Sequence, residues 1–193
     1  MRLRRGLYGI AYAGFGDPVA LGRALLAGGA TTLQLRCKGW AVADVAAAAR
    51  ALQPLCRDAK VPLVINDHLE LVEAGLGDGL HLGQDDGPFD RSRLPPGTLV
   101  GRSTHDLAQV AAADADYLGF GPVFTTTTKE AAGEARGLDR LAAACRATPL
   151  PVVAIGGITA DRLPAVEAAG AYAWAVISAI LGTSDPEAAA RAF

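Results

Sequence analysis

The stretch Ala27-Gly-Gly-Ala-Thr-Thr-Leu-Gln-Leu35 indicates the fold most clearly, because it closes a helix on glycine and starts an apolar strand at once. The same order returns at Ala74-Gly-Leu-Gly-Asp-Gly-Leu-His-Leu82 and at Ala169-Gly-Ala-Tyr-Ala-Trp-Ala-Val176. A helix–glycine–strand unit that repeats along a chain is typical of parallel strands joined by helical crossovers. We therefore expect an α/β protein.

Apolar runs of strand length recur along the whole chain, and we expect them to close into a barrel rather than form an open doubly wound sheet. The predicted strands cover residues 7–12, 31–36, 62–67, 79–83, 98–103, 115–123, 151–157 and 171–180. The sequence therefore predicts a (β/α)8 TIM barrel that forms a single domain over residues 1–193.

Proline, glycine and capping residues indicate where the predicted helices start and stop. Asp17-Pro18 and Asp185-Pro186 each pair an N-cap residue with Pro at the first helical position, and Thr159 is predicted to cap another helix. Pro54 should end or kink the helix predicted over residues 41–58. The segment 85–97 is rich in Gly and Pro, which predicts a short fourth crossover with at most a short helix.

The bulk composition excludes several classes of protein. The chain has 193 residues, of which 51% are hydrophobic, and a net charge of −2. This balance offers no electrostatic footprint for nucleic acid, and no apolar run is long enough to span a membrane. Cys37, Cys56 and Cys145 are odd in number and lack metal-ligand spacing, which favours reduced thiols in the cytoplasm.

Three polar side chains share one face at the end of the second predicted strand. Gln34, Arg36 and Lys38 alternate with apolar residues, so they should point into the barrel and its mouth. The alternative is a set of solvated residues at a strand end. A bound anion would offset the cost of burying such a stripe, so we favour an anion-binding role.

Two carboxylates follow neighbouring strands and are candidate Mg2+ ligands. Asp67 ends the third strand beside Asn66, and Asp86 follows the fourth. Magnesium typically takes one or two protein carboxylates together with waters and phosphate oxygens. The alternative for Asn66 or Asp67 is an N-cap for a helix over residues 69–74.

Further along the chain, hydroxyls, a lysine and glycines suggest sites for phosphate. Thr126, Thr128 and Lys129 lie in a polar loop over residues 125–133 that resembles a phosphate-binding flap, although a plain polar loop is the alternative. Gly156 ends the seventh strand and Ile177-Ser178 end the eighth, where such barrels commonly bind phosphate. Simple turn glycines are the alternative there.

The end of the fifth strand carries Ser103, Thr104 and His105. Ser103 is a candidate to hydrogen-bond a substrate ring, with Thr104 capping the next helix in its place. A lone His in a first helical turn is more often structural than catalytic.

Together these motifs resemble the thiamine phosphate synthase family over nearly the whole chain. The matching segments are Gln34-Leu-Arg-Cys-Lys38, Ile65-Asn-Asp67, Gly79-Leu-His-Leu-Gly-Gln-Asp-Asp86, Ser103-Thr-His105, Gly119-Phe-Gly-Pro-Val-Phe124, Thr126-Thr-Thr-Lys129, Val153-Ala-Ile-Gly-Gly-Ile-Thr159 and Val176-Ile-Ser-Ala-Ile180. The resemblance implies a magnesium-dependent transferase that moves the hydroxymethylpyrimidine group from its diphosphate to hydroxyethylthiazole phosphate.

The resemblance also implies roles for individual residues. Asp67 and Asp86 would hold Mg2+. The pyrimidine diphosphate would contact Gln34, Arg36, Lys38, Asn66, Ser103 and Lys129, and the thiazole phosphate would contact Thr126, Thr128, Gly156, Ile177 and Ser178. Catalytic roles would fall to Arg36, Ser103 and Lys129, and departure of diphosphate would precede attack by the thiazole nitrogen.

Two other functions remain open from the sequence. Thiazole tautomerases of the same superfamily use a His near His105, and an inactive relative would serve as a ligand-binding or regulatory protein. The chain also departs from the family pattern at Tyr12 and Arg102, and Tyr172 and Trp174 are expected to crowd the thiazole side. The partners expected are small-molecule substrates, and homo-oligomers are possible.

Overall fold

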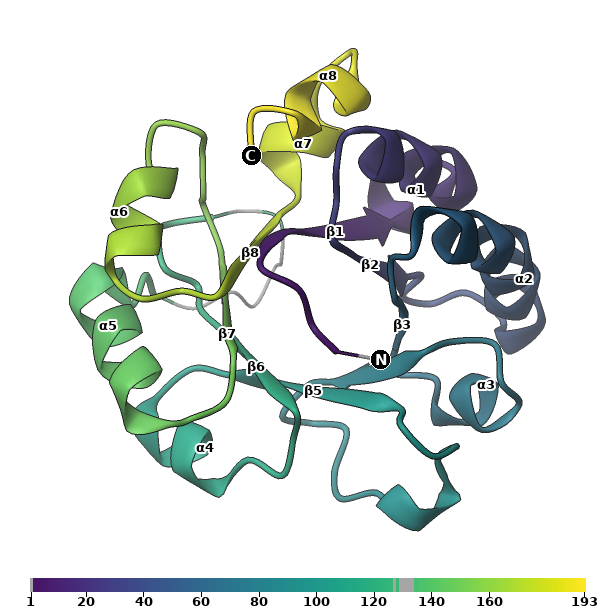
Figure 1. Ribbon diagram of the computed structural model, residues 1–193, viewed down its shortest axis with the longest axis horizontal. Helices are drawn as coiled ribbons and strands as arrows, with labels where there is room; N and C mark the ends of the chain where they lie inside the picture. Colours follow the sequence, from purple (N-terminus) through teal and green to yellow (C-terminus); the bar gives the residue numbers. More distant parts are fainter. Residues whose placement is uncertain (1, 127, 129–133) are drawn as a thin grey trace.

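The computed structural model describes residues 2–126, 128 and 134–193. Parallel strands close into one barrel in the order β1 to β8, which confirms the predicted TIM-barrel fold (Figure 1). The strands are β1 (Gly6–Tyr12), β2 (Thr32–Arg36), β3 (Leu63–Asn66), β4 (Gly79–Leu82), β5 (Leu99–Thr104), β6 (Tyr117–Phe120), β7 (Val152–Ile155) and β8 (Ala173–Val176).

Helices surround the strands in Figure 1, as the alternating sequence pattern predicts. The α-helices are α1 (Pro18–Ala27), α2 (Val42–Ala59), α3 (Leu69–Glu73), α4 (Leu107–Ala112), α5 (Gly137–Ala147), α6 (Leu163–Ala168), α7 (Ser178–Leu181) and α8 (Pro186–Ala190). Two 3-10 turns, η1 (Ala13–Phe15) and η2 (Arg91–Arg93), complete the described elements. Asp17 and Asp185 cap α1 and α8 with their side chains, as predicted.

Side chains alternate between two packed layers, and this alternation decides which residues reach the barrel interior. Leu33 and Leu35 belong to the apolar layer that packs with the helices. Gln34 lies between them, and in the strand register it lies beside Ile10 of β1 and Val64 of β3, two interior residues. The predicted orientation of the β2 stripe (Gln34, Arg36 and Lys38) is therefore confirmed.

Three local predictions about helices and strands are wrong. The predicted helix end at Pro54 is wrong, because α2 continues through this residue to Ala59; Pro54 is exposed, so water can satisfy the carbonyl that the missing N–H leaves free. The eighth strand ends at Val176 rather than at residue 180, because Ser178–Leu181 form α7. Thr159 does not cap α6, whose N-cap position is Arg162.

The fourth crossover is short, as predicted, and contains only η2 between β4 and β5. At the other end of the barrel, the chain before β1 crosses the opening, and Leu3 joins the interior cluster (Figure 1). Within the part of the chain that the structure describes, none of the helices has the length and apolar character needed to cross a membrane.

Candidate active site

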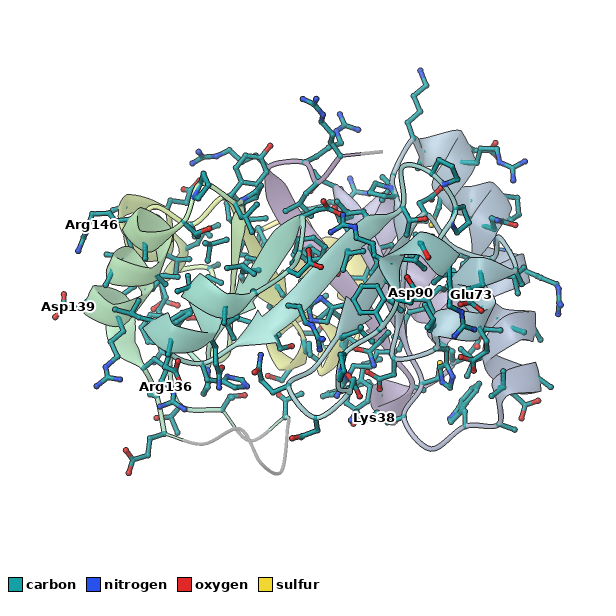
Figure 2. All side chains as sticks on the ribbon, turned by 90° about the horizontal axis from the view of Figure 1, so that it is seen from below. Lys38, Glu73, Asp90, Arg136, Asp139 and Arg146 are labelled. Atoms are coloured by element: carbon teal, nitrogen blue, oxygen red, sulfur yellow. The ribbon has the colours of Figure 1, made fainter. Side chains whose placement is uncertain are left out.

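A cavity of about 670 Å³ opens where the strands end, on the face where such barrels keep their chemistry. Ten of the predicted site residues line it: Gln34, Arg36, Lys38, Asn66, Ser103, Thr126, Thr128, Gly156, Ile177 and Ser178. Lys38 lies at the lower edge of Figure 2, the same edge as Arg136 just before α5. Lys129 lies outside the described residues.

The β2 stripe is engaged with β3 rather than solvated as a whole. Gln34 is buried, and the Nη1 of Arg36 donates a hydrogen bond of 2.8 Å to the Oδ1 of Asn66. Further out, the Nζ of Lys38 lies 3.9 Å from the Oδ2 of Asp67. Because the Lys38 side chain is 55% exposed, this pair contributes little to stability, and its cation is available to a ligand.

Asp67 and Asp86 lie next to each other, as predicted from the strand order, and Asp67 is beside the cavity residue Lys38, although neither acid itself lines the cavity. Burial raises the pKa of the Asp67 carboxyl, the neighbouring Asp86 charge raises it further, and Lys38 and Arg36 oppose both effects. Asp67 also takes a left-handed backbone conformation with φ of 68°. Neither Asn66 nor Asp67 caps α3, because His68 occupies the N-cap position.

This pair of acids fits a magnesium ion that is shared with a phosphate ligand. Among the described residues, here as elsewhere, His, Cys, Asp and Glu do not gather in threes in a way that could hold a metal, so a cation at this site would rely on these two acids alone. Magnesium is usually bound through one or two carboxylates and completes its shell with water and substrate phosphate oxygens. Repulsion between Asp67 and Asp86, which raises the pKa of Asp67, is relieved when a cation lies between them.

A hydrogen-bonded chain of buried polar side chains crosses the cavity floor, and the sequence did not reveal it. The Nε2 of Gln34 donates to the hydroxyl of Tyr8 at 3.0 Å, and the Tyr8 and Tyr117 hydroxyls lie 2.7 Å apart. His81 bridges the Tyr117 hydroxyl and the Ser103 Oγ, each at 3.0 Å. Burial raises the pKa of both tyrosines, so both hydroxyls stay neutral. The hydrogen bond to His81 holds the Ser103 side chain in place.

On the other side of the cavity, the loop after β7 turns its carbonyls away from the ligand space. The N–H of Val123 donates to the Ile155 carbonyl at 2.8 Å, and the N–H of Phe124 donates to the Gly156 carbonyl at 3.0 Å. In a planar trans peptide the next N–H points opposite to the carbonyl. The N–H groups of Gly156 and Gly157 are therefore directed away from these partners, on residues that line the cavity.

Arg162 fixes the third peptide of the same loop. Its Nη1 donates to the Gly157 carbonyl at 2.8 Å, and its guanidinium lies 4.7 Å from the centroid of the Phe124 ring. The N–H of Ile158, which also lines the cavity, consequently faces away from Arg162. Successive backbone N–H groups left without carbonyl partners in one loop can form a concave site for an anion such as phosphate.

The described part of the polar loop after β6 joins this side of the cavity. Thr126 and Thr128 both line it, and their hydroxyls lie 3.3 Å apart. The N–H of Thr128 donates to the Thr126 Oγ1 at 3.4 Å, which forms a local turn. Both threonines therefore line the same cavity as Gly156 and the Ile177-Ser178 segment.

The end of β5 differs from the predicted capping arrangement. Thr104 donates its hydroxyl hydrogen bond to the Gly119 carbonyl at 3.0 Å, and Asp106 is the residue that caps α4. His105 precedes the helix, and its Nδ1 lies 2.6 Å from the Gly121 carbonyl. This bond gives His105 the structural role that we favoured, although the ring also lines the cavity.

Tyr172 and Trp174 do not crowd the cavity, so that prediction is wrong. Tyr172 lies at the opposite end of the barrel, where its hydroxyl donates to the Leu3 carbonyl at 3.4 Å. Trp174 points into the helical layer, and its Nε1 donates to the Phe193 carbonyl at 3.0 Å. The β8 residues that line the cavity are Ala175 and Val176, both smaller than Trp174.

Tyr12, by contrast, is a cavity residue whose contact with Arg36 the sequence analysis did not identify. Its ring centroid lies 5.7 Å from the Arg36 guanidinium carbon and 6.0 Å from the centroid of the Phe15 ring. An aromatic face under the guanidinium restricts its orientation and leaves its donors free to face Asn66 and a ligand. The available signal was the alternation of side chains along β1, which places Tyr12 on the inward face.

Comparisons with known proteins agree on one family. Residues 7–180 match the family described as thiamine monophosphate synthase. The thiamine-phosphate synthase of Salinibacter ruber is 45% identical over 178 residues, which cover 90% of this chain and 78% of the relative. That of Anaeromyxobacter dehalogenans is 45% identical over 190 residues, or 96% and 84% of the two chains. The solved thiamine phosphate pyrophosphorylase from Pyrococcus furiosus has a TM-score of 0.89 and 32% identity, and the match covers 98% of this chain and 93% of that one.

Proposed function

This chain belongs to the thiamine monophosphate synthase family, and we propose that it joins a hydroxymethylpyrimidine group to hydroxyethylthiazole phosphate, forming thiamine phosphate and releasing diphosphate. The observation that carries the proposal is a single cavity with two anion sites. Acids and cations from β2 to β4 lie on one side, and a cradle of backbone N–H groups in the loop after β7 lies on the other, next to Ser178 after β8.

On the donor side, the pyrimidine diphosphate would lie against Gln34, Arg36, Lys38 and Asn66. Mg2+ held by Asp67 and Asp86 would neutralise the charge that builds up on the leaving diphosphate. Arg36, held by its hydrogen bond of 2.8 Å to Asn66, supplies a fixed positive charge. The partly exposed Lys38 supplies a more mobile positive charge at the same edge. Lys129, which lies outside the described residues, is proposed to complete this set.

On the acceptor side, the thiazole phosphate would occupy the cradle of Gly156, Gly157 and Ile158 N–H groups. The hydroxyls of Thr126, Thr128 and Ser178, with the backbone at Ile177, would provide the remaining contacts. What supports this assignment is the orientation of the carbonyls of Ile155, Gly156 and Gly157, all of which are bonded away from the cavity.

In the proposed reaction the bond from the methylene carbon to the diphosphate oxygen breaks, and its electron pair leaves with the diphosphate. The lone pair of the thiazole ring nitrogen then forms the new carbon–nitrogen bond. No side chain has to remove a proton from that nitrogen. The residues act by holding the two reactants in line and by stabilising the leaving charge, with Arg36, Ser103 and Lys129 in the catalytic roles.

The two alternatives fit the site less well. A tautomerase would depend on His105 and would need no paired acids, whereas Asp67 and Asp86 lie next to each other and Nδ1 of His105 is bonded to the Gly121 carbonyl. A regulatory relative would not need cations and acids arranged around a leaving diphosphate. The relatives at 45% identity also carry the name thiamine-phosphate synthase.

Two further parts of the proposal concern the chain as a whole. We propose that residues 1–193 form one domain, which the continuous barrel from β1 to β8 supports. We also propose a cytoplasmic location, since Cys37, Cys56 and Cys145 are free thiols and burial raises the pKa of Cys37 to about 11.

The test is to mix the purified protein with both substrates and Mg2+ and to follow thiamine phosphate, with a parallel sample that contains EDTA. We expect product only in the sample with free metal. Product in EDTA would refute the magnesium assignment, and no product with both phosphates bound would favour the regulatory alternative.

A further inference from the structure

The crossover between β4 and β5 must hold Asp86 in place without an α-helix. It spans residues 83–98 and contains only η2, which comes after Asp86. Asp86 itself is exposed on this segment, in contrast to Asp67, which directly follows β3. Something other than helix packing has to fix the Asp86 carboxylate opposite Asp67.

Arg102 supplies that restraint. Its side chain leaves β5 toward the crossover, where Nη1 donates to the Gly83 carbonyl at 2.7 Å and Nη2 donates to the Gly87 carbonyl at 2.6 Å. The guanidinium carbon also lies 5.9 Å from the centroid of the Phe89 ring. Gly83 and Gly87 lie on either side of Asp86 in the sequence, so the two bonds hold both ends of the short segment that carries it.

Two other contacts complete the attachment of this segment to β5. The Nε2 of Gln84 donates to the Ser103 carbonyl, and the N–H of Gly83 donates to the Asp86 Oδ2. The segment is thus bonded to two consecutive β5 residues, Arg102 and Ser103. Gly83, which Arg102 holds through its carbonyl, in turn orients the Asp86 carboxylate through its N–H. A guanidinium suits this position because its planar donors can reach two carbonyls at once, which one ammonium group cannot do as well.

We propose that Arg102 is a positioning residue that holds Asp86 at the distance and orientation needed to share a divalent cation with Asp67. This inference rests on the proposed metal role of the two acids. Without the two bonds, segment 83–87 would sample other conformations, and the paired site would be assembled for only a fraction of the time. The expected consequences are faster amide exchange in this segment and weaker metal binding.

Arg93 offers a matched control in the same crossover. Its Nε lies 2.7 Å from the Oε1 of Glu73 on α3, so it restrains the far half of the crossover and not the Asp86 segment. Removing Arg93 also removes one arginine from this crossover but leaves Gly83 and Gly87 held.

The test compares Arg102→Met, Arg102→Lys and Arg93→Met with the unchanged protein. Hydrogen exchange of peptides covering residues 83–90 is measured by mass spectrometry without ligand. Mn2+ affinity is measured by electron paramagnetic resonance in the presence of inorganic pyrophosphate. For Arg102→Met we expect faster exchange in this segment and Mn2+ binding weakened about 10-fold or more, the size of effect typical for a residue that orients a metal ligand. Arg102→Lys should recover part of both losses, and Arg93→Met should change neither.

Unchanged exchange in residues 83–90 of Arg102→Met would overturn the positioning role whether or not metal binds. Unchanged Mn2+ affinity in that variant would overturn it as well. Thermal unfolding of each variant separates a local effect from a global one, and Arg102→Lys carries the comparison if Arg102→Met does not fold. If Asp86→Asn binds Mn2+ as tightly as the unchanged protein, the metal assignment fails instead, which is a different result from failure of the Arg102 role.

Discussion

Gly156→Ala tests the backbone cradle, because glycine is required there for two separate reasons. Gly156 has a φ of 101°, a conformation that other residues rarely adopt. A Cβ at this position would also lie 2.5 Å from the Cβ and 2.6 Å from the Cα of Pro122. Since the neighbour is backbone and a rigid ring, the loop after β7 would have to move.

The two effects can be given separate magnitudes. The unfavourable backbone conformation costs about 1–3 kcal/mol, and forcing a methyl group into occupied space costs about 1–3 kcal/mol more. We therefore expect Gly156→Ala to lower the free energy of unfolding by about 2–6 kcal/mol, which a typical domain can survive. Gly75→Ala is the matched control, because Gly75 has a φ of 76° and no atom within 4 Å of its Cβ position.

Urea unfolding followed by tryptophan fluorescence measures these losses, since Trp174 is buried and becomes exposed on unfolding while Trp40 is exposed throughout. The loss in Gly156→Ala should exceed that in Gly75→Ala by the contact contribution of about 1–3 kcal/mol. In steady-state kinetics, displaced N–H groups should raise KM for the thiazole phosphate about 10-fold or more, since a hydrogen bond to a charged group contributes about 1.5–3 kcal/mol. KM for the pyrimidine diphosphate should stay near its original value. Equal stability losses in the two variants, or a matching rise in both KM values, would refute the cradle.

Three further variants test separate parts of the site. Asp67→Asn should lower Mg2+-dependent turnover about 100-fold or more. It should also stabilise the metal-free protein at neutral pH. The pKa of Asp67 in the folded state is raised above its ordinary 3.8, so ionisation of this carboxyl destabilises the folded state as the pH rises above 3.8 and through the folded pKa. Urea unfolding at several pH values should therefore show the variant as the more stable protein at neutral pH and no difference below pH 3.8. Lys129→Ala should slow diphosphate release in a single turnover far more than it weakens thiazole phosphate binding, and an unchanged single-turnover rate would contradict its role. Arg162→Met should raise KM for the thiazole phosphate while leaving kcat and the Mg2+ requirement unchanged, because it frees the Gly157 carbonyl; a loss of kcat alone would contradict this.

Much of the site was predictable because its polar residues interrupt apolar strands in a regular pattern. Gln34, Arg36 and Lys38 alternate with apolar neighbours, so their inward direction follows from the period of a strand alone. Asp67 and Asp86 follow neighbouring strands, and parallel strands bring their ends to one edge. For these residues, local pattern and topology lead to the same arrangement.

The errors and omissions occur where the local pattern does not decide the orientation. The run 171–180 is apolar on both faces, as strands buried on both sides are, so nothing in it shows that Trp174 points to the helices and Ala175 to the cavity. The chain from Tyr8 through Tyr117 to His81 depends on partners far apart in sequence, and each residue alone is typical of core. Arg102 is a similar case, because its two carbonyl partners lie in a crossover without regular pattern.

The central claim is that one cavity holds both substrates and transfers the pyrimidine group between them. The most direct measurement is a single turnover with enzyme in excess over the pyrimidine diphosphate, saturating thiazole phosphate and Mg2+, with both products quantified by rapid quench. The account predicts equal amounts of diphosphate and thiamine phosphate, and loss of both in Asp86→Asn. Diphosphate released without thiamine phosphate, or thiamine phosphate formed at an unchanged rate in Asp86→Asn, would contradict it.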